Sequence, residues 1–222
     1  MPSFEGLKVL RSGKPHEEDF RRFAALPSRG LFLDLGAHAG QSAASFHLVQ
    51  PGWRILSLEP DPAMRWSLAL TALALRGRMR FRMVGAGRRA GMATLHVPRA
   101  GGRRLEGEAS FEASIFASDE PTRSRLRELA AGRELSYDAM ERPMVRIDDL
   151  GLSPGAVKLD LQGGELAAIE GMLGTLRHHR PWVLMENNLH SRTIVELLRP
   201  LGYQPEGRFE ELNLLLKPLS GR

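Results

Sequence analysis

The sequence predicts an α/β protein with a mostly parallel sheet covered by helices on both faces. Short apolar runs alternate with segments of helical period along the 222-residue chain, and this alternation is typical of parallel sheets. Three of the apolar runs end in a carboxylate: Glu59, Asp160 and Glu186. In open α/β sheets, ligands bind outside the carboxyl ends of the strands. These acids therefore mark a candidate ligand-binding edge.

Composition favours a single soluble domain that spans residues 1–222. The chain is 42% hydrophobic and 26% charged, as globular proteins are. No apolar run approaches the about 18 residues that a membrane helix needs, and the first residues lack the apolar core of a signal peptide. The absence of cysteine excludes disulfides, thiolate metal sites and cysteine nucleophiles. We expect a cytoplasmic enzyme or binding protein without a membrane partner.

A net charge of +5 and a cluster of arginines raise the question of a nucleic-acid partner. Between Arg76 and Arg104 lie nine arginines and no acidic residue. The arginines at 76, 78, 80 and 82 alternate with other residues, which predicts a strand charged on one face. Such a strand suits a sheet edge. We favour this over a nucleic-acid footprint because aromatic stacking partners are few, and an acidic substrate remains open.

The elements follow from periodicity and from the glycines and prolines between them. We expect strands over residues 31–35, 53–58, 79–84, 93–97, 145–147, 156–161, 181–185 and 212–216, with 203–209 as a partner of the last. Helices are expected over 15–26, 40–50, 62–75, 121–135 and 193–201, and from about 164. Residues 1–28 form an N-terminal helical extension. The rest of 99–140 is predicted to be irregular, and we interpret this insertion as a substrate lid.

The segment LDLGAHAGQS, residues 33–42, is the first candidate binding motif. Glycines between a buried strand and a helix let the backbone approach a ligand closely. The G-x-x-x-G spacing lacks the G-x-G-x-x-G of dinucleotide binders, which weakens a nicotinamide hypothesis. Asp34 would repel a phosphate and suits a positively charged ligand, such as an amino-acid sulfonium. A tight structural turn is the alternative.

Glu59 is the second candidate, at the end of the second predicted strand. A carboxylate at this place can accept hydrogen bonds from both ribose hydroxyls of a nucleoside. The alternative is an acid that is solvated or that caps the following helix. Together with the glycine turn, Glu59 favours cofactor binding.

Five motifs give the chain a family resemblance. LDLGAHAGQS, SLEPDP, VRIDDL, VKLDLQGGELAAIEGM and RPWVLMEN follow one another between residues 31 and 187. In order and spacing they resemble the FkbM family of S-adenosylmethionine-dependent methyltransferases, of the class I methyltransferase fold. KLDLQGGE is the most specific motif. Gly164 stands there in place of the family's usual alanine, and GAG at 85–87 replaces an Ala-Val-Gly type sequence.

The resemblance implies a Rossmann-like, mostly parallel seven-stranded sheet with a final antiparallel strand, and S-adenosylmethionine as cofactor. By position, Asp34, Gly36 and Gly40 would contact its methionine part and Ser42 its carboxylate. Glu59 would hold the ribose, and the chain around Gly85 would line the adenine. Asp160 would face the sulfonium. Family members commonly methylate hydroxyl oxygens of sugars, polyketides and other natural products.

We therefore expect a methyltransferase that acts on a hydroxyl of a small-molecule acceptor. A basic nucleic-acid-associated protein, either an RNA methyltransferase or a non-catalytic binder, is the alternative. Lys158 lies inside an apolar strand, where it is either a functional amine or a paired structural charge. Glu165 is explained as an acid at a helix N-terminus.

Catalytic candidates lie on the same predicted edge. Asp160 and Glu186 end neighbouring strands, and His38 or His190 could act as general base. The oxygens of Asp160, Glu186 and Asn187 could also converge on Mg²⁺, which prefers hard oxygen ligands. The alternative is that the carboxylates only hydrogen-bond cofactor and acceptor.

Overall fold

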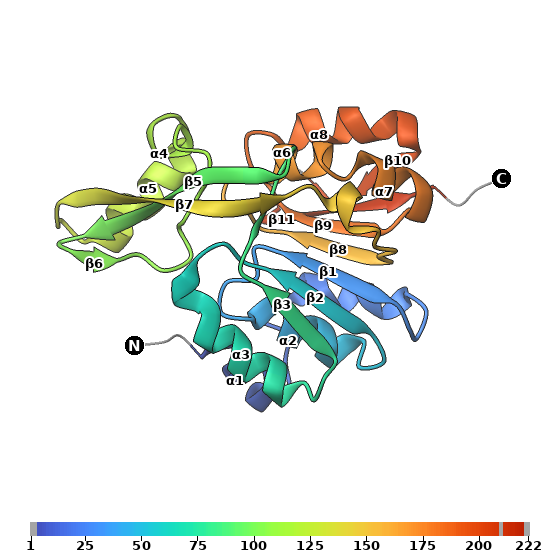
Figure 1. Ribbon diagram of the computed structural model, residues 1–222. Coiled ribbons are helices and arrows are strands. Elements are labelled where there is room, and N and C mark those ends of the chain that lie inside the picture. Colours follow the sequence, from blue (N-terminus) through green and yellow to red (C-terminus); the bar gives the residue numbers. More distant parts are fainter. Residues whose placement is uncertain (1–3, 209–210, 220–222) are drawn as a thin grey trace.

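The computed structural model describes residues 4–208 and 211–219 and contains a main sheet of seven strands (Figure 1). Their spatial order is β10-β11-β9-β8-β1-β2-β3. All neighbours from β9 to β3 are parallel, and β11 is antiparallel to both β9 and β10. The strands are β1 Leu31–Leu35, β2 Arg54–Leu58, β3 Met79–Arg82, β8 Ala156–Leu159, β9 Trp182–Glu186, β10 Tyr203–Glu206 and β11 Asn213–Pro218. The predicted sheet is thereby confirmed; position 209 of the last predicted pair lies outside the described residues.

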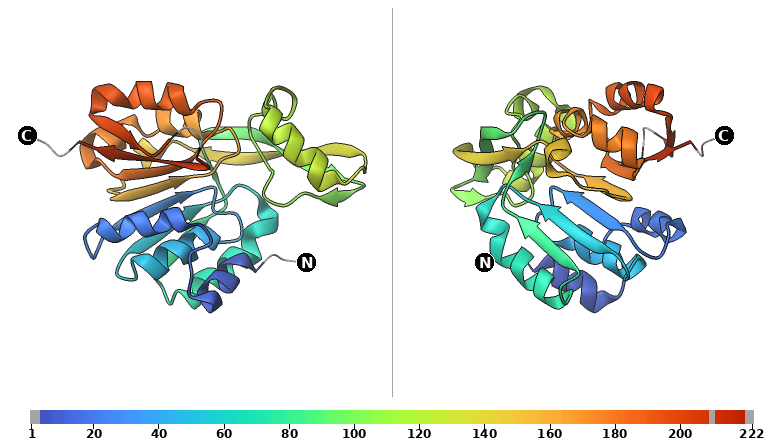
Figure 2. Two further views of the ribbon diagram at one scale, coloured as in Figure 1. Left: turned by 180° about the vertical axis from the view of Figure 1, so that it is seen from behind. Right: turned by 45° about the vertical axis from the view of Figure 1, so that its right-hand side comes forward.

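Helices cover the main sheet on two sides (Figure 2). One face carries α1 Glu5–Ser12, the 3-10 helices η1 Glu18–Ala25 and η2 Pro62–Met64, α2 Gln41–Val49 and α3 Arg65–Ala74. The other carries α6 Glu165–Glu170, α7 Leu173–His179 and α8 Ser191–Leu198, with the 3-10 helices η3 Ile147–Leu150 and η4 Arg199–Leu201. This three-layer arrangement buries both faces of β8 and all of β1 after Leu31, as a parallel sheet requires.

The two faces have different cores, and alternation in β1 shows how. Phe32 lies in a cluster rich in aromatic rings, and its ring stacks on that of Phe46 with centroids 3.9 Å apart. Leu33 and Leu35 point to the opposite face, into an aliphatic cluster under α6, α7 and α8. Asp34 shares the face of Phe32 and is fully buried. A charge at the centre of the sheet therefore needs partners from neighbouring strands.

A second, four-stranded sheet projects sideways from the main sheet (Figure 1). Its order is β4-β7-β5-β6, with β4 Gly85–Ala86, β5 Gly91–Ala100, β6 Arg103–Arg104 and β7 Leu135–Val145, and the helices α4 Ile115–Ser118 and α5 Glu120–Ala130 pack beside it. The prediction of an irregular chain was therefore wrong for 136–140, and also for β6, α4 and the end of β5. β7 has no buried residue, so it lacks an apolar alternation, and backbone pairing with β5 defines it.

Smaller differences have similar causes. Helix α1 lies within the helical extension predicted for 1–28, but its bounds were not predicted, because it buries only Gly6 and Val9. The predicted helix 15–26 is the shorter η1, and the strand expected at 145–147 ends at Val145. The helix expected from 164 divides near Gly171, where a β-carbon would lie 2.1 Å from the carbonyl oxygen of Gly87.

The arginine-bearing strand β3 is confirmed as an edge of the main sheet. Arg78, Arg80 and Arg82 are exposed, whereas Met79 between them is buried. Among the described residues, no helix is long and apolar enough to cross a membrane.

Substitution of Gly36, directly after β1, tests how closely the backbone there approaches the backbone of Asp160, directly after β8. Its φ is +85°, and a β-carbon would lie 1.8 Å from the carbonyl oxygen of Asp160. Because backbone cannot move aside cheaply, Gly36→Ala should lower the free energy of unfolding by about 3 kcal/mol or more. Gly13→Ala is the control: its φ is +65° with nothing within 4 Å, so only the left-handed backbone should cost about 1–2 kcal/mol. Urea denaturation measures both, and equal losses would contradict the close approach.

Candidate active site

A cavity of about 320 Å³ lies at the carboxyl ends of β1, β2, β8 and β9. The first half of the main sheet lines it with Gly36, His38, Gln41, Glu59, Pro60 and Asp61. The second half contributes Asp160, Leu161, Gln162 and Glu186. Further walls come from the N-terminal segment with His16 and Glu17, from the second sheet and its loops, and from Leu212. The cavity is thus enclosed by segments from the whole chain.

The glycine turn after β1 shapes one wall. The backbone N–H groups of Gly36 and Ala37 both donate to the carbonyl of Leu58, at 3.0 and 3.1 Å. Gly40 has a φ of +90°, and a β-carbon there would lie 2.8 Å from Oγ1 of Thr71. Gly36 lines the cavity whereas Gly40 supports the turn from behind. Both glycines are required by close approach, as the motif predicted.

Glu59 fastens the turns after β1 and β2 to each other. Its Oε2 accepts the N–H of His38 and its Oε1 accepts the N–H of Asp61, each at 2.8 Å. Burial raises the pKa of Glu59 to about 8, against the opposite effect of these two backbone donors. Each carboxylate oxygen has a second lone pair. Glu59 can therefore still accept a hydrogen bond from a ligand in the cavity.

Four predicted cofactor contacts do not line the cavity: Asp34, Gly40, Ser42 and Gly85. Asp34 is fully buried beneath the turn, where Oδ2 accepts a hydrogen bond from Ser57 Oγ at 2.8 Å and Oδ1 has no partner. Burial raises the pKa of Asp34 to about 6. Asp34 therefore lies in the layer behind the cavity wall and not on the wall itself.

The sequence left two roles open for Lys158, a functional amine or a paired structural charge, and the structure shows the paired charge. Its side chain is 1% exposed, and its Nζ lies 3.2 Å from Oδ2 of Asp160 and 3.7 Å from Oε2 of Glu17. Although burial acts the other way, these two carboxylates raise the pKa of Lys158. In turn the ammonium group holds the pKa of Asp160 below its usual value, against the effect of burial. Asp160 therefore faces the cavity as a carboxylate.

Glu186 is joined to Asp160 through Gln162. The Gln162 side-chain amide donates to Oδ1 of Asp160 at 3.1 Å and to Oε2 of Glu186 at 3.3 Å. Gln162 and Gly163 both have left-handed backbone, with φ of +49° and +95°. This turn folds the Gln162 side chain back between the two acids. Burial and the neighbouring Asp160 charge raise the pKa of Glu186 to about 8.

Glu165 has a larger structural role than that of an acid at a helix N-terminus. It is fully buried; Oε1 accepts the N–H of Leu161 at 2.7 Å, and Oε2 accepts the side-chain amide of Asn188 at 2.5 Å. Glu165 therefore connects the turn after β8 to the loop after β9. These two segments carry Asp160 and Glu186, whose relative position depends on this connection.

Asn187 and His190 are not brought to the cavity. The Asn187 side-chain amide donates to the carbonyl of Glu211 at 2.6 Å, and the His190 backbone N–H donates to Oδ1 of Asn188 at 2.9 Å. Asn187 does not line the cavity with Asp160 and Glu186, and its buried Oδ1 has no hydrogen-bond partner. Within residues 4–208 and 211–219, no group of three or more His, Cys, Asp or Glu is placed to hold a metal ion. The magnesium site therefore stays a prediction.

Two histidines line the cavity instead. His38 belongs to the glycine turn, and its buried Nε2 has no hydrogen-bond partner. His16 is held by Ser45, whose Oγ lies 2.8 Å from His16 Nδ1. The residues around His16 show only the pattern of a helix start, so no local pattern indicated that His16 would line a binding cavity. Glu17 was missed for the same reason.

The insertion is attached to both halves of the site. Arg104 donates to Oδ2 of Asp61 at 2.5 Å, and Ser110 Oγ donates to the carbonyl of Gln162 at 2.7 Å. Between them the chain passes over the cavity with Glu106, Ala109 and Phe111 among the lining residues. The insertion therefore forms a wall of the cavity, in the place expected of a lid.

The sheet order and the cavity at its carboxyl edge define a class I methyltransferase fold. The chain belongs to the FkbM methyltransferase family, because the family model "Methyltransferase FkbM domain" matches residues 34–217. The resemblance seen in the five motifs is thereby confirmed.

Solved structures share the fold at low sequence identity. Methyltransferase FkbM from Methylobacillus flagellatus KT is 15% identical with a TM-score of 0.56, over 95% of this chain and 58% of that one. The chain thus spans little more than half of that protein. A putative rRNA-methylase from Clostridium thermocellum is 10% identical with a TM-score of 0.52, over 94% and 98%. No curated protein sequence matches the chain.

The buried carboxyls predict that the protein loses stability as the pH rises from about 4.5 to about 8. Glu59 and Glu186 have an ordinary pKa of 4.5 and a folded pKa of about 8. In this window the folded state binds more protons than the unfolded chain, so the free energy of unfolding falls as the pH rises. Urea denaturation at successive pH values measures the slope. It should flatten in Glu59→Gln and Glu186→Gln but not in Glu128→Gln, an exposed site on α5; a stability that increases with pH would contradict the assignment.

Proposed function

We propose that this protein transfers the methyl group of S-adenosylmethionine to a hydroxyl oxygen of a small, uncharged acceptor. The observation that carries the proposal is the cavity at the strand ends, where the Gly36 turn and Glu59 face Asp160, Gln162 and Glu186. Membership of the FkbM methyltransferase family supports methyl transfer as the reaction.

The residues fit S-adenosylmethionine in several respects. Glu59 keeps lone pairs for ribose hydroxyls, and the Gly36 turn admits close approach of a ligand. Asp160, an ionised carboxylate, would attract a sulfonium. Gly85 lies behind the Phe111 ring, whose nearest atom would be 2.4 Å from a β-carbon at Gly85, so Phe111 is the side chain offered to the adenine. When bound, the cofactor supplies an electrophilic methyl group.

The charge of the cavity selects the acceptor. Six acidic side chains line it, from Glu17, Glu59, Asp61, Glu106, Asp160 and Glu186, and the lining has one arginine, Arg125. Lys158 and Arg104 already pair with three of these acids, so the wall offers a phosphate group few cationic partners. A neutral polyol or phenol would instead find hydrogen-bond acceptors for its hydroxyls. The cavity therefore favours a neutral small molecule over a nucleic acid as acceptor.

The chain's own contribution to the reaction is orientation and proton acceptance. Asp160 and Gln162 can hold the acceptor hydroxyl in line with the methyl group, and such positioning lowers the barrier. Glu186 has a pKa of about 8 through burial and the Asp160 charge, which is close to neutral pH, where a general base is most effective. We assign Glu186 as the group that takes the hydroxyl proton. His38, which has a free Nε2 in the wall, is the second candidate.

Cofactor binding can be tested by calorimetric titration with S-adenosylhomocysteine. The protein should bind it, and Glu59→Ala should lose about 2–3 kcal/mol of binding free energy, about 30- to 150-fold in affinity, because the hydrogen bonds to both ribose hydroxyls are lost. Glu106→Ala removes another carboxyl group of the cavity lining and should leave the affinity unchanged. Folded protein that does not bind would refute the proposal. Equal effects of the two variants would move the ribose contact away from Glu59.

Proton acceptance can be tested by a pH profile of methyl transfer. A screen of neutral hydroxylated compounds with radiolabelled S-adenosylmethionine identifies an acceptor. Because Glu186 must be ionised to accept a proton, the rate with that acceptor should rise as the pH passes about 8. Glu186→Gln should lower the rate about 100-fold or more and remove this rise while the affinity for S-adenosylhomocysteine is kept. A rise that persists in Glu186→Gln would assign the base to His38.

A further inference from the structure

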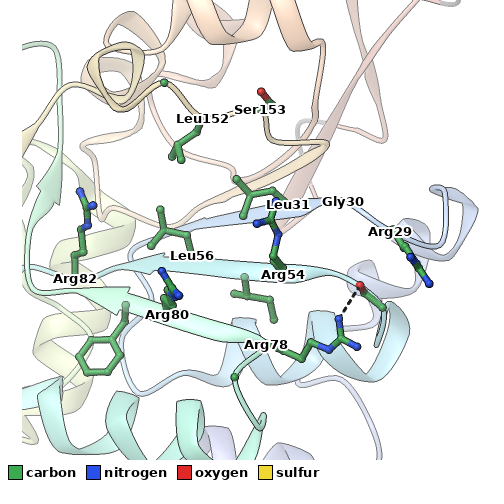
Figure 3. Close-up of a pocket in the computed structure, with 15 residues that line it drawn as sticks. Arg29, Gly30, Leu31, Arg54, Leu56, Arg78, Arg80, Arg82, Leu152 and Ser153 are labelled. Atoms are coloured by element: carbon green, nitrogen blue, oxygen red, sulfur yellow. Dashed lines mark hydrogen bonds between the residues drawn. The ribbon is translucent and has the colours of Figure 1, made fainter.

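The main sheet has an uncovered area on the face that carries α6, α7 and α8. These helices pack over β8, β9 and the inner residues of β1, but a groove of about 1240 Å³ follows β1, β2 and β3 on the same side (Figure 3). After β3 the chain enters the second sheet instead of a covering helix. Leu31 and Leu56 form the floor, and the loop before β8, with Leu152, forms one wall. A layer of the fold is missing here.

Five arginines line this groove: Arg29, Arg54, Arg78, Arg80 and Arg82. No acidic residue lines it, and within the described part of the chain none of the five forms an ion pair with a carboxylate. By contrast, Arg104, Arg125 and Arg146 elsewhere on the surface are each paired with acids. The groove therefore has a concentrated positive charge that the chain itself leaves without a counter-charge.

Apolar and charged side chains are segregated across the groove. In register, Leu33 of β1 neighbours Leu56 of β2, which neighbours Arg80 of β3. One step toward the carboxyl ends, Leu58 of β2 neighbours Arg82 of β3. At the amino ends of the strands, Arg54 of β2 neighbours Leu31 of β1, and Arg29 precedes β1. The leucines near Leu152 are thus bordered by arginines along the sheet edge and at the amino ends of the strands. An occupant must combine an apolar stripe with a flanking row of negative charge.

We propose that the groove binds an acidic amphipathic helix of a partner protein. A helix on this face would complete the missing layer, with its apolar stripe on Leu31, Leu56 and Leu152 and its carboxylates beside the arginines. Five-residue strands such as β2 are about 16 Å long, which corresponds to about 11 helical residues or three turns. Guanidinium groups bind carboxylates in a bidentate fashion, so glutamates on one edge of the helix would be recognised in register.

Nucleic acid is a poorer fit to the same surface. Sequence-independent binding of a single strand relies on aromatic platforms as well as positive charge. Phe81, the aromatic residue at this groove, alternates with the arginines of β3 and packs against the core of the opposite face. The floor offers leucines, which suit an apolar helix stripe and not stacked bases.

The groove is separate from the cavity at the strand ends, since no residue lines both. Arg29, Arg54 and Arg78 lie at the amino ends of the strands, whereas the cavity lies at the carboxyl ends. A helix could therefore be bound while the cavity stays open. The proposal is independent of the proposed methyl transfer, and either can fail without the other.

Binding of designed peptides tests the proposal by fluorescence anisotropy with the full chain. The probe is a stapled helix of about 14 residues with leucines at positions i, i+3, i+4 and i+7 and glutamates on the flanks. It should bind with micromolar affinity. Replacing its glutamates by lysine, or its leucines by glutamine, should weaken binding about tenfold or more. Arg54→Glu/Arg80→Glu in the protein should do the same, while Arg11→Glu/Arg65→Glu, an equal charge change on the opposite layer, should not.

Circular dichroism and urea denaturation, measured in parallel, show that each variant is folded. Undetectable binding of the glutamate peptide at 1 mM peptide would overturn the proposal. So would equal affinity for the glutamate and lysine peptides, or insensitivity to Arg54→Glu/Arg80→Glu. An oligothymidylate of twelve nucleotides is the competing probe. Tighter binding of this strand, with steep salt dependence and loss in Arg54→Glu/Arg80→Glu, would assign the groove to nucleic acid instead.

Discussion

A single buried ammonium group organises the carboxyl edge of the main sheet. Lys158 lies between Asp160 on its own strand and Glu17 from the N-terminal segment, and its charge also acts on Asp34. A buried, unpaired charge is costly, and so is a cluster of like charges. One cation among these acids cannot neutralise all of them. Protonation of some of the acids reduces the remaining negative charge. The raised pKa values of Asp34 and Glu186 indicate that these two groups take up the protons.

The division of labour between Asp160 and Glu186 follows from this shortage of positive charge. Both acids lie at the ends of neighbouring strands and share the amide of Gln162. Only Asp160 contacts Lys158, and so only Asp160 is ionised well below neutral pH. Glu186 is buried and lies near the negative charge of Asp160, so it retains its proton to a higher pH. Two chemically similar side chains thus differ in the pH at which they lose their protons.

The sequence predicted the central sheet well because its signals are local. Apolar runs such as LFLDL, glycines in the turns and carboxylates at the strand ends each act within a few residues. Of the second sheet, β5 was predicted in part, over 93–97, whereas β7 was missed, since it is defined by pairing with β5 and has no buried face of its own. Of the predicted site residues, Gly36, Glu59, Asp160 and Glu186 line the cavity. Asn187 and His190 do not, because the direction of a side chain after a strand depends on the loop it meets. His16 and Glu17 come from a distant segment and carry no pattern that adjacent residues could reveal.

The contact of Glu17 with both Lys158 and Asn213 has a consequence for the order of folding. Asn213 donates to Oε2 of Glu17 at 3.1 Å, across 196 positions of the sequence. Loops of this length close late, because their entropy must be lost before any contact compensates for it. The hydrogen bonds of Glu17 are therefore complete only once β11, which carries Asn213, has been synthesised and has packed. On the ribosome, this corner of the carboxyl edge would reach its full set of contacts after the central strands have paired.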